Sequence, residues 1–327
     1  MSQIQNKRLM RKAGLEISEY GLGAWAIGGA HYGPVAEEKA KEVISNYLKS
    51  GANFIDTARG YGESERIIGE VITEMGLKHE TVIATKTLAG SELSTIPQMR
   101  KDLEESLRQL NRDYVDIFFI HFPSEDPQIM DASLSECEKF KKEGLIRAIG
   151  SSIKGPDVTQ STVDLATRYI EDGRTDVLLM VYSIFRQMNA PVFELAEKNG
   201  VGVILRTVLE SGFLTGAMQK GIRFPESDHR CRWNERIDGI LDEVEYIRRL
   251  AVKEPYEMVS DVALHFAVQG AHHTSVLTGA ENMNHLSSNL RAIELPPLPD
   301  EVMKALKERY GNMTERFNSG FGEQSFK

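Results

Sequence analysis

The sequence predicts an α/β protein of the (β/α)8 TIM barrel class with a short N-terminal hairpin. Eight short runs rich in β-branched residues alternate with amphipathic helical stretches, which is the pattern of parallel strands joined by crossover helices. The chain has 327 residues, a suitable length for one such barrel. A doubly wound sheet shares this local pattern and is the alternative fold.

Each predicted strand is a short apolar run. A hairpin over residues 9–23 leads into the first strand, near EYGLG. The remaining strands are ANFID, TVIATK, YVDIFFIH, IRAIGSS, VLLMVYS, VGVILRT and TSVLTG. No linker rich in proline or serine interrupts the alternation, so residues 1–327 are expected to form a single domain.

The helical stretches have the apolar face and the end signals of helices that cover a barrel. The stretch EKAKEVISNYLKS places Ala40, Val43, Ile44 and Leu48 on one face. Residues suited to helix C-caps stand before several of the next strands: Gly51, Gly76, Asn111, Gly144 and Gly200.

The composition excludes several classes of partner. The net charge is −9, which argues against nucleic acid or an anionic membrane as the main partner. No apolar stretch approaches the length of a membrane span, and the first residues lack the apolar core of a signal peptide. Cys137 falls in a helical stretch and Cys231 in a polar loop, outside any CxxC pattern. We therefore expect no disulfide, no metal site and a cytoplasmic location.

Four ionisable side chains stand at or just after the ends of three successive predicted strands. Asp56, Lys86 and His121 end their strands, and Tyr61 lies in the loop after Asp56. The carboxyl ends of barrel strands carry the active site in this fold class. A lysine ammonium favours the phenolate and lowers the pKa of a tyrosine, and a carboxylate keeps that lysine charged. With a histidine to donate to a carbonyl oxygen, this set suits protonation of the alkoxide formed by hydride transfer.

A glycine-rich motif near the N-terminus would, taken alone, indicate a dinucleotide-binding fold instead of the barrel. The segment Gly21 to Ala26 matches the G-x-G-x-x-A fingerprint of dinucleotide-binding folds. That fingerprint requires a helix to begin at once, whereas IGGAHYGPV follows and the next helix is expected near Ala36. The dinucleotide-binding interpretation is therefore disfavoured.

The segment DTARGYGESERIIG resembles the aldo-keto reductase signature D-[TS]-A-x-x-Y-G-x-x-E-x-x-[LIV]-G, and VIATK, IHFP and GFLTG are similar to segments of that family. The resemblance implies a (β/α)8 barrel that binds extended NAD(P)H and interconverts an alcohol and a carbonyl of an aldehyde, ketone or sugar. It also implies that Asp56, Tyr61, Lys86 and His121 form the catalytic tetrad, with Tyr61 as general acid and base.

The resemblance also implies a set of nucleotide contacts. The nicotinamide would meet the end of AIGSS, the pyrophosphate would lie over the loop 207–215, and adenosine would meet residues 279–289. The residues so assigned are Ser151, Ser152, Tyr182, Arg206, Thr207, Leu209, Ser211, Gly212, Leu214, Thr215, Gly279, Glu281, His285 and Asn289.

Three departures from the family pattern lie on the nicotinamide side. Ser151-Ser152 stands where the family commonly has Ser-Asn, and Leu179 replaces a glutamine. Arg206 aligns with the aromatic residue that stacks on the nicotinamide. Either Tyr182 supplies a replacement ring, or the Arg206 guanidinium does the stacking.

The choice between NADP(H) and NAD(H) is evenly balanced in the sequence. Family members that use NADPH often carry arginine at the position of Glu281, and a carboxylate there repels a 2′-phosphate. Family base rates favour NADPH, and Arg291 or the basic loop 229–236 offers an alternative cation for that phosphate.

The substrate is expected to be a small molecule held by aromatic side chains. Trp25, Tyr32, Phe122 and Trp233 are the candidates for an apolar or sugar-stacking wall. Two other functions are compatible with the sequence. One is a regulatory nucleotide-binding protein, as potassium-channel β subunits in this family are. The other is a non-redox lyase or isomerase that uses Lys86 as a Schiff-base amine.

Overall fold

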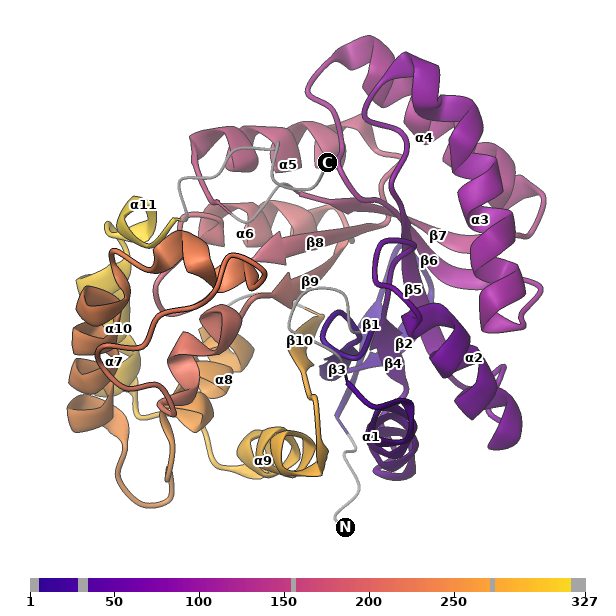
Figure 1. Cartoon of the computed structure of the whole chain (residues 1–327). Coiled ribbons are helices and arrows are strands. Elements are labelled where there is room, and N and C mark those ends of the chain that lie inside the picture. Colours follow the sequence, from indigo (N-terminus) through magenta and orange to yellow (C-terminus); the bar gives the residue numbers. More distant parts are fainter. Residues whose placement is uncertain (1–5, 29–34, 154–156, 271–273, 319–327) are drawn as a thin grey trace.

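The computed structural model describes residues 6–28, 35–153, 157–270 and 274–318. Within these residues eight parallel strands close into a barrel in the order β10-β3-β4-β5-β6-β7-β8-β9, with helices around it (Figure 1). An antiparallel hairpin, β1 (Lys7–Met10) and β2 (Leu15–Ser18), precedes the barrel. The predicted (β/α)8 class is confirmed, and the doubly wound alternative is wrong because the sheet closes on itself.

Every barrel strand coincides with a predicted run to within about two residues. The strands are β3 (Tyr20–Gly23), β4 (Phe54–Asp56), β5 (Val82–Thr87), β6 (Val115–Ile120), β7 (Ile146–Ser152), β8 (Val177–Val181), β9 (Gly202–Arg206) and β10 (Ser275–Gly279). Gly21 and Gly23 of the G-x-G-x-x-A match lie inside β3, and the next helix begins only at Glu37. This segment is therefore a barrel strand and not the turn of a dinucleotide-binding fold.

The helix layer is larger than the expected eight helices. The helices are α1 (Glu37–Lys49), α2 (Ser64–Glu74), α3 (Ile96–Leu110), α4 (Pro127–Lys142), α5 (Gln160–Asp172), α6 (Ala190–Lys198), α7 (Ile237–Ala251), α8 (Val259–Gly270), α9 (Met283–Glu294), α10 (Asp300–Tyr310) and α11 (Thr314–Phe317). Two of them, α7 and α8, lie between β9 and β10, and α10 and the short α11 follow α9. The predicted C-cap residues all have positive φ angles, between 52° and 88°: Gly51, Gly76, Asn111, Gly144 and Gly200.

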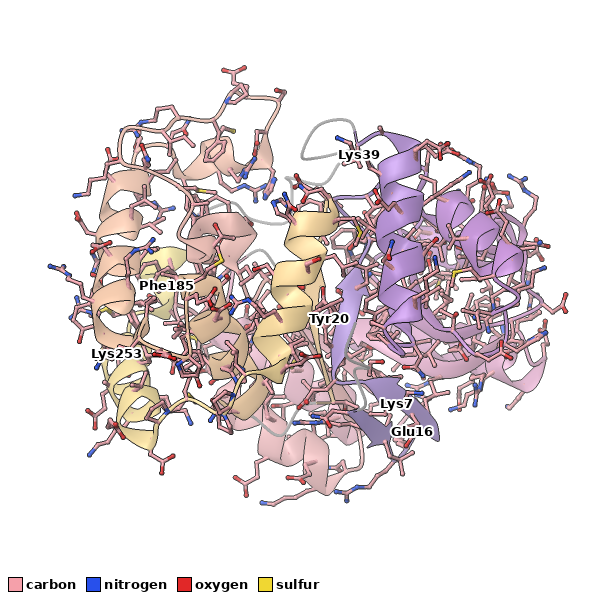
Figure 2. The ribbon with its side chains drawn as sticks, turned by 90° about the horizontal axis from the view of Figure 1, so that it is seen from below. Lys7, Glu16, Tyr20, Lys39, Phe185 and Lys253 are labelled. Atoms are coloured by element: carbon pink, nitrogen blue, oxygen red, sulfur yellow. The ribbon has the colours of Figure 1, made fainter. Side chains whose placement is uncertain are left out.

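The barrel interior is filled with apolar side chains and is plugged at one end. Phe54, Phe119 and Leu179 belong to the inner cluster, which also includes Met10 and Ile17 of the hairpin strands. The hairpin therefore covers the end where the strands begin. Figure 2, seen from below, shows the hairpin residues Lys7 and Glu16 beside Tyr20 of β3. The other end of the barrel, where the strands finish, is left for polar side chains.

The cysteines and the helices carry no unusual features. Cys137 is buried on α4, and Cys231 lies in a short 3-10 helix, η3 (His229–Trp233), where a polar loop was expected; both are free thiols. In the described part of the chain, no helix is long and apolar enough to cross a membrane. The same residues contain no group of three potential His, Cys, Asp or Glu metal ligands.

Helices α2 and α3 approach each other closely at Gly69. A Cβ atom built on Gly69 would lie 2.4 Å from the carbonyl oxygen of Gln109 and 2.8 Å from the Cα of Leu110. Because both obstacles are backbone atoms of α3, no side-chain movement relieves the clash. Gly69 is also the last residue of the DTARGYGESERIIG segment, so helix packing explains a glycine there.

We expect Gly69→Ala to lower the free energy of unfolding by about 1–3 kcal/mol, because the added methyl group overpacks the interface between α2 and α3. Gly239 of α7 is the matched control, since a Cβ there meets nothing within 4 Å. Gly239→Ala should instead stabilise by about 0.5 kcal/mol through its effect on helix propensity. Urea unfolding of both variants measures the difference, and equal effects of the two would contradict the packing role.

Candidate active site

Three of the four predicted ionisable residues point into the barrel mouth. Side chains alternate along a strand, and Phe54, Ala84 and Phe119 belong to the inner cluster. Residues two positions further along face the same way. Asp56 ends β4, Lys86 is the last but one residue of β5, and His121 directly follows β6. All three therefore face inward where these neighbouring strands pair in parallel.

Lys86 is fully buried and makes three short hydrogen bonds. Its Nζ donates to both carboxylate oxygens of Asp56 and to the carbonyl oxygen of Thr57, each at 2.7 Å. These three contacts use the three hydrogens of the ammonium group. Asp56 is itself buried, and burial raises the pKa of its carboxyl while the nearby Lys86 opposes that rise. The pair is the charged floor of the barrel mouth.

Tyr61 lies beside this ion pair. The Nζ of Lys86 is 4.8 Å from the centre of the Tyr61 ring. Burial raises the pKa of the Tyr61 phenol, Asp56 adds to the rise, and Lys86 and Arg206 oppose it. The predicted effect of the lysine is thus present, but the net direction differs from the expected lowering because removal of the phenol from water has the larger effect.

The backbone around Tyr61 is held on two sides. The Tyr61 amide donates to the carbonyl oxygen of Ala58, and the Tyr61 carbonyl accepts from the amide of Ser64, at 3.0 and 3.2 Å. A Cβ atom built on Gly28 would lie 1.7 Å from the Tyr61 carbonyl oxygen. The segment after β3 therefore packs directly on this loop, and only glycine permits that approach.

His121 presents a neutral ring to the same space. Its ring stacks on Phe122 at 4.4 Å and meets the Tyr61 ring edge-on at 6.1 Å. Burial lowers the pKa of His121 well below its ordinary value, and the Lys86 and Arg206 charges lower it further. Its buried Nδ1 has no hydrogen-bond partner among the described residues. The imidazole is therefore uncharged at neutral pH.

Arg206 ends β9 on the inner face, in the same phase as Ile204 of the inner cluster. Its Nη atoms make only long contacts of 3.4 Å, to Thr207 Oγ1 and to the carbonyl oxygen of Ile153. Its Nε is buried and lacks a hydrogen-bond partner in the described part of the chain. Burial lowers the pKa of Arg206, which Tyr61 partly opposes. A second cation thus stands at the barrel mouth, and no carboxylate of the described ranges forms an ion pair with it.

Two residues assigned to the nicotinamide point the other way. Tyr182 is buried against Phe193 and Phe266 in the layer between strands and helices. Ser151 Oγ lies 3.2 Å from Thr175 Oγ1, and strand alternation directs it outward. Tyr182 is therefore not placed to replace a stacking ring, nor Ser151 to contact a ligand in the mouth. Ser152 and Leu179 lie on the inward phase of their strands.

The loop after β9 has an unusual backbone. Thr207, Glu210 and Ser211 have positive φ angles of 62°, 48° and 55°, and Gly212 has 95°. A residue of ordinary helical conformation followed by left-handed residues makes a concave turn of the type that binds anions. The remaining assigned residues, Leu209, Leu214 and Thr215, belong to this loop, and Thr215 Oγ1 donates to the carbonyl oxygen of Gly212 at 2.7 Å.

A buried ion pair holds this strained loop. Arg186 donates through Nε and Nη2 to the two carboxylate oxygens of Glu210, at 2.9 and 2.6 Å. Ser183 Oγ also donates to Glu210. Both charged side chains are almost completely buried. Because left-handed non-glycine residues are unfavourable, this paired anchor is what maintains the turn.

The region assigned to adenosine, residues 279–289, contains the carboxylate of Glu281 and no arginine of its own. Glu281 is partly exposed just before α9, whose first turn is capped by Asn282 accepting from the amide of His285. Asn289 is buried and donates to Thr278 Oγ1, Tyr20 Oη and the Gly279 carbonyl oxygen.

The predicted alternative cations are engaged elsewhere. Arg291 donates to both oxygens of Asp261, at 2.8 Å each, and so is directed toward the start of α8. In the basic loop, Arg230 forms a two-pronged contact with Asp228 and Arg232 donates to the carbonyl oxygen of His229.

The aromatic residues predicted for the substrate wall do not all lie beside the ionisable group. Trp25 is next to Tyr61, with ring centres 6.3 Å apart, and Phe122 stacks on His121. Trp233 is buried behind them against Phe213. Tyr32 lies outside the described residues. Trp25 and Phe122 are therefore near the ionisable group, whereas Trp233 supports the loop.

The match to known proteins decides the family. A model of the aldo/keto reductase family matches residues 19–310. The chain belongs to the aldo/keto reductase family. This confirms the predicted class, an oxidoreductase that interconverts a carbonyl and an alcohol with a nicotinamide nucleotide.

Similar proteins include two curated relatives and a solved structure. The aldo-keto reductase YhdN of Bacillus subtilis is 33% identical over a match that spans 66% of each chain. The NADH-specific methylglyoxal reductase of Escherichia coli is 27% identical over 86% of this chain and 91% of its own. The structure of a glycerol dehydrogenase from Gluconobacter oxydans has a TM-score of 0.74 at 25% identity, covering 92% of this chain and 94% of its own.

Sequence reasoning missed several residues of this aldo-keto reductase. His229 was grouped only with the basic loop. Its ring centre lies 4.9 Å from that of Trp25, and its Nε2 lies 3.2 Å from Ser211 Oγ. Arg186 and Glu210 were not singled out, and only their unusual types in apolar surroundings were a signal. Glu65 was visible as the glutamate of the family signature, without an assigned role.

We expect Arg186→Met to lower the free energy of unfolding of this aldo-keto reductase by about 3–5 kcal/mol, because it leaves the Glu210 carboxylate buried and unpaired. Arg223→Met is the control, since Arg223 forms an exposed pair with Asp238 at 2.9 Å. That change should cost at most about 1 kcal/mol. Chemical denaturation compares the two, and similar losses would contradict an anchoring role for the buried pair.

Proposed function

We propose that this protein reduces a small aldehyde or ketone with a hydride from a nicotinamide nucleotide, using Tyr61 as the general acid. The carrying observation is the Lys86–Asp56 ion pair beside the Tyr61 ring, at 2.7 Å and 4.8 Å respectively. This arrangement stabilises the phenolate that forms when Tyr61 gives up its proton.

The described residues fit a nicotinamide nucleotide. Ser152 and Leu179 lie on the inward phase of β7 and β8, and Arg206 has a buried Nε without a hydrogen-bond partner within the described ranges. The concave loop from Thr207 to Thr215 suits a pyrophosphate. We propose that these residues hold the nicotinamide and the diphosphate, with the Arg206 guanidinium in place of the usual aromatic ring.

The chemistry divides between the nucleotide and the side chains. When bound, the reduced nucleotide supplies a hydride to the carbonyl carbon. Tyr61 transfers its phenolic proton to the carbonyl oxygen, so the carbonyl becomes an alcohol and the phenol a phenolate. Lys86 stabilises that phenolate, and Asp56 holds Lys86 in position. The neutral His121 ring donates a hydrogen bond that orients the carbonyl oxygen.

The geometry disfavours the non-redox alternative. A Schiff base requires a lysine nitrogen with a free lone pair. All three donors of Lys86 are engaged by Asp56 and Thr57 at 2.7 Å. Lys86 is therefore better suited to hold a charge than to attack a carbonyl.

Tyr61→Phe should lower kcat/KM for carbonyl reduction by about 10²–10⁴-fold, because it removes the proton donor. The measurement follows absorbance at 340 nm with NADH and NADPH against a panel of aldehydes. Nucleotide binding, measured by fluorescence, should be unchanged in the variant. Full activity in Tyr61→Phe would contradict the role given to Tyr61. Tight nucleotide binding with no turnover of any substrate would favour the regulatory alternative.

The pH profile of the wild-type enzyme tests the same assignment. Because the pKa of Tyr61 is raised, kcat/KM for reduction should remain on its plateau until about pH 10 and then fall as the phenol loses its proton. Because the pKa of His121 is far below its ordinary value, no inflection from an imidazole is expected between about pH 6 and pH 9. A loss of activity centred at about pH 6.5 would contradict the assignment of an uncharged His121.

We propose that NADH is the preferred nucleotide. Glu281 repels a 2′-phosphate and accepts hydrogen bonds from a ribose diol. Arg291, Arg230 and Arg232 are engaged by other groups.

Glu281→Arg should raise the ratio of kcat/KM for NADPH to that for NADH by about tenfold or more, because it replaces a repulsion by a charge-assisted contact with the 2′-phosphate. Glu301→Arg on α10 is a control with the same charge change away from this region. An unchanged ratio in Glu281→Arg would contradict the proposed preference for NADH.

A cytoplasmic location is part of the proposal. Both cysteines are free thiols and neither is near a disulfide partner, which suits a reducing compartment.

A further inference from the structure

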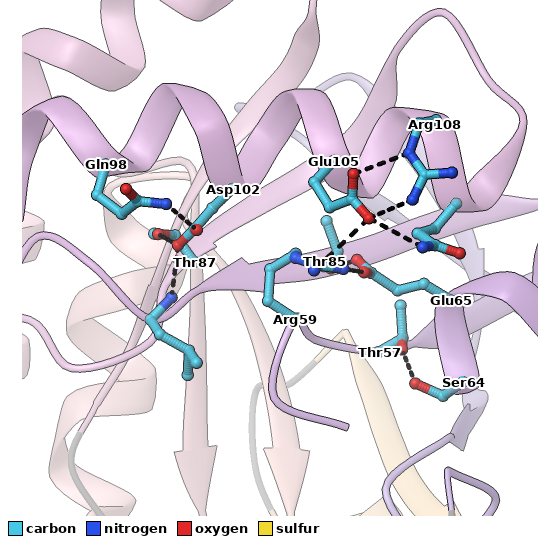
Figure 3. Close-up of polar contacts among 12 residues, drawn as sticks. Thr57, Arg59, Ser64, Glu65, Thr85, Thr87, Gln98, Asp102, Glu105 and Arg108 are labelled. Atoms are coloured by element: carbon cyan, nitrogen blue, oxygen red, sulfur yellow. Dashed lines mark hydrogen bonds and ion pairs between the residues drawn. The ribbon is translucent and has the colours of Figure 1, made fainter. Parts of the chain in front are cut away.

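We propose that Glu65 is a positioning residue that fixes Tyr61 relative to Lys86. Glu65 is the second residue of α2 and touches neither of these two groups. It acts through Arg59 and Thr85, which donate to different oxygens of its carboxylate (Figure 3). The inference rests on the proposed role of Tyr61 in carbonyl reduction.

The first carboxylate oxygen anchors the strand that carries the lysine. Glu65 Oε1 accepts a hydrogen bond from Thr85 Oγ1 at 2.6 Å. Thr85 immediately precedes Lys86 on β5, and neighbouring side chains of a strand point to opposite faces. Thr85 thus meets α2 on the outside of the barrel while Lys86 points into the mouth. A bond to Thr85 therefore holds β5 at the point where it positions the ammonium.

The second carboxylate oxygen anchors the loop that carries the tyrosine. Glu65 Oε2 accepts from Arg59 Nη1 at 2.5 Å. Arg59 lies two residues before Tyr61, and its backbone amide donates to the carbonyl oxygen of Lys86 at 3.1 Å. The same loop is closed at its ends by a contact of 2.7 Å between Thr57 Oγ1 and Ser64 Oγ. One carboxylate thus joins the loop to the strand.

Burial makes this junction stiff. The Glu65 side chain is 2% exposed, and the Arg59 side chain 24%. A buried carboxylate is strongly unfavourable without a charged partner, so Glu65 and Arg59 hold each other in one arrangement. Arg59 is also within 4.0 Å of Glu105 on α3, which limits its alternatives. The interaction of the ammonium with the phenolate depends on their separation, so a looser loop weakens it.

Glu65→Gln tests the proposal because it keeps the shape of the side chain and removes its charge. We expect kcat for reduction to fall about tenfold, since small displacements of a reacting group are costly, with KM within about twofold. The alkaline limb of the pH profile should move upward by about half a pH unit or more, because Lys86 then lowers the phenol pKa less. Arg59→Lys should keep most of the activity, and Arg59→Gln should match Glu65→Gln.

Glu70→Gln is the matched control. Glu70 lies on the same helix and forms half-exposed pairs with Arg66 and Lys41, so Glu70→Gln removes the same charge without removing a contact of Arg59 or Thr85. If Glu65→Gln and Glu70→Gln share the same kcat and the same alkaline limb, the proposal is wrong. If Glu65→Gln does not fold, Thr85→Val, which retains the Arg59 pair, replaces it and is judged in the same way.

A readout without turnover separates this proposal from the proposed function. If the wild type reduces no carbonyl with either nucleotide, the proposed function fails. The phenol of Tyr61 is then titrated by ultraviolet absorbance, as the difference between each protein and the same protein carrying Tyr61→Phe. A higher Tyr61 pKa in Glu65→Gln than in Glu70→Gln supports the positioning role, and equal values overturn it.

Discussion

The buried ion pair between Lys86 and Asp56 is the interaction on which the candidate site depends. It joins the ends of two neighbouring strands, β5 and β4, and the third hydrogen bond of Lys86 reaches the first residue of the loop that carries Tyr61. Removal of either charge would leave the other buried and uncompensated. Strand ends, loop direction and the electric field at the phenol are therefore set together by one ammonium group.

Burial and the nearby cations together set the pKa values of Tyr61 and His121. Burial favours the uncharged form of both groups, so it raises the pKa of Tyr61 and lowers that of His121. Lys86 and Arg206 oppose the change at Tyr61 and reinforce the change at His121. Both rings therefore begin uncharged at neutral pH. The two cations, which also stabilise the carboxylate of Asp56, would stabilise the negative charge that develops on Tyr61 as it donates its proton.

The parts of this structure that follow from local sequence could be predicted, and the parts that follow from tertiary pairing could not. The strands and the C-cap residues, such as Asn111, depend on local apolar runs and backbone conformation. The outward directions of Ser151 and Tyr182 depend on the phase of alternation, which strand pairing fixes. Glu65 with Thr85, and Arg186 with Glu210, join positions 20 and 24 residues apart. The net shift of the Tyr61 pKa required the extent of burial, which no motif contains.

Two separate anchors hold the two sides of the barrel mouth. Glu65 joins the Tyr61 loop to β5, and Arg186 with Glu210 holds the strained loop after β9. The anchors share no residue, and effects of distant sites without shared partners are usually additive. The proposed nicotinamide side can therefore depart from the family pattern, as we infer at Leu179 and Arg206, while the proposed proton-transfer side keeps its geometry. Arg206 is the one described side chain whose charge acts on Tyr61 and Asp56 from the other side of the mouth. We therefore expect a change at this arginine to act both on the phenol and on the proposed nucleotide contact, whereas a change within either anchor should act on one of them.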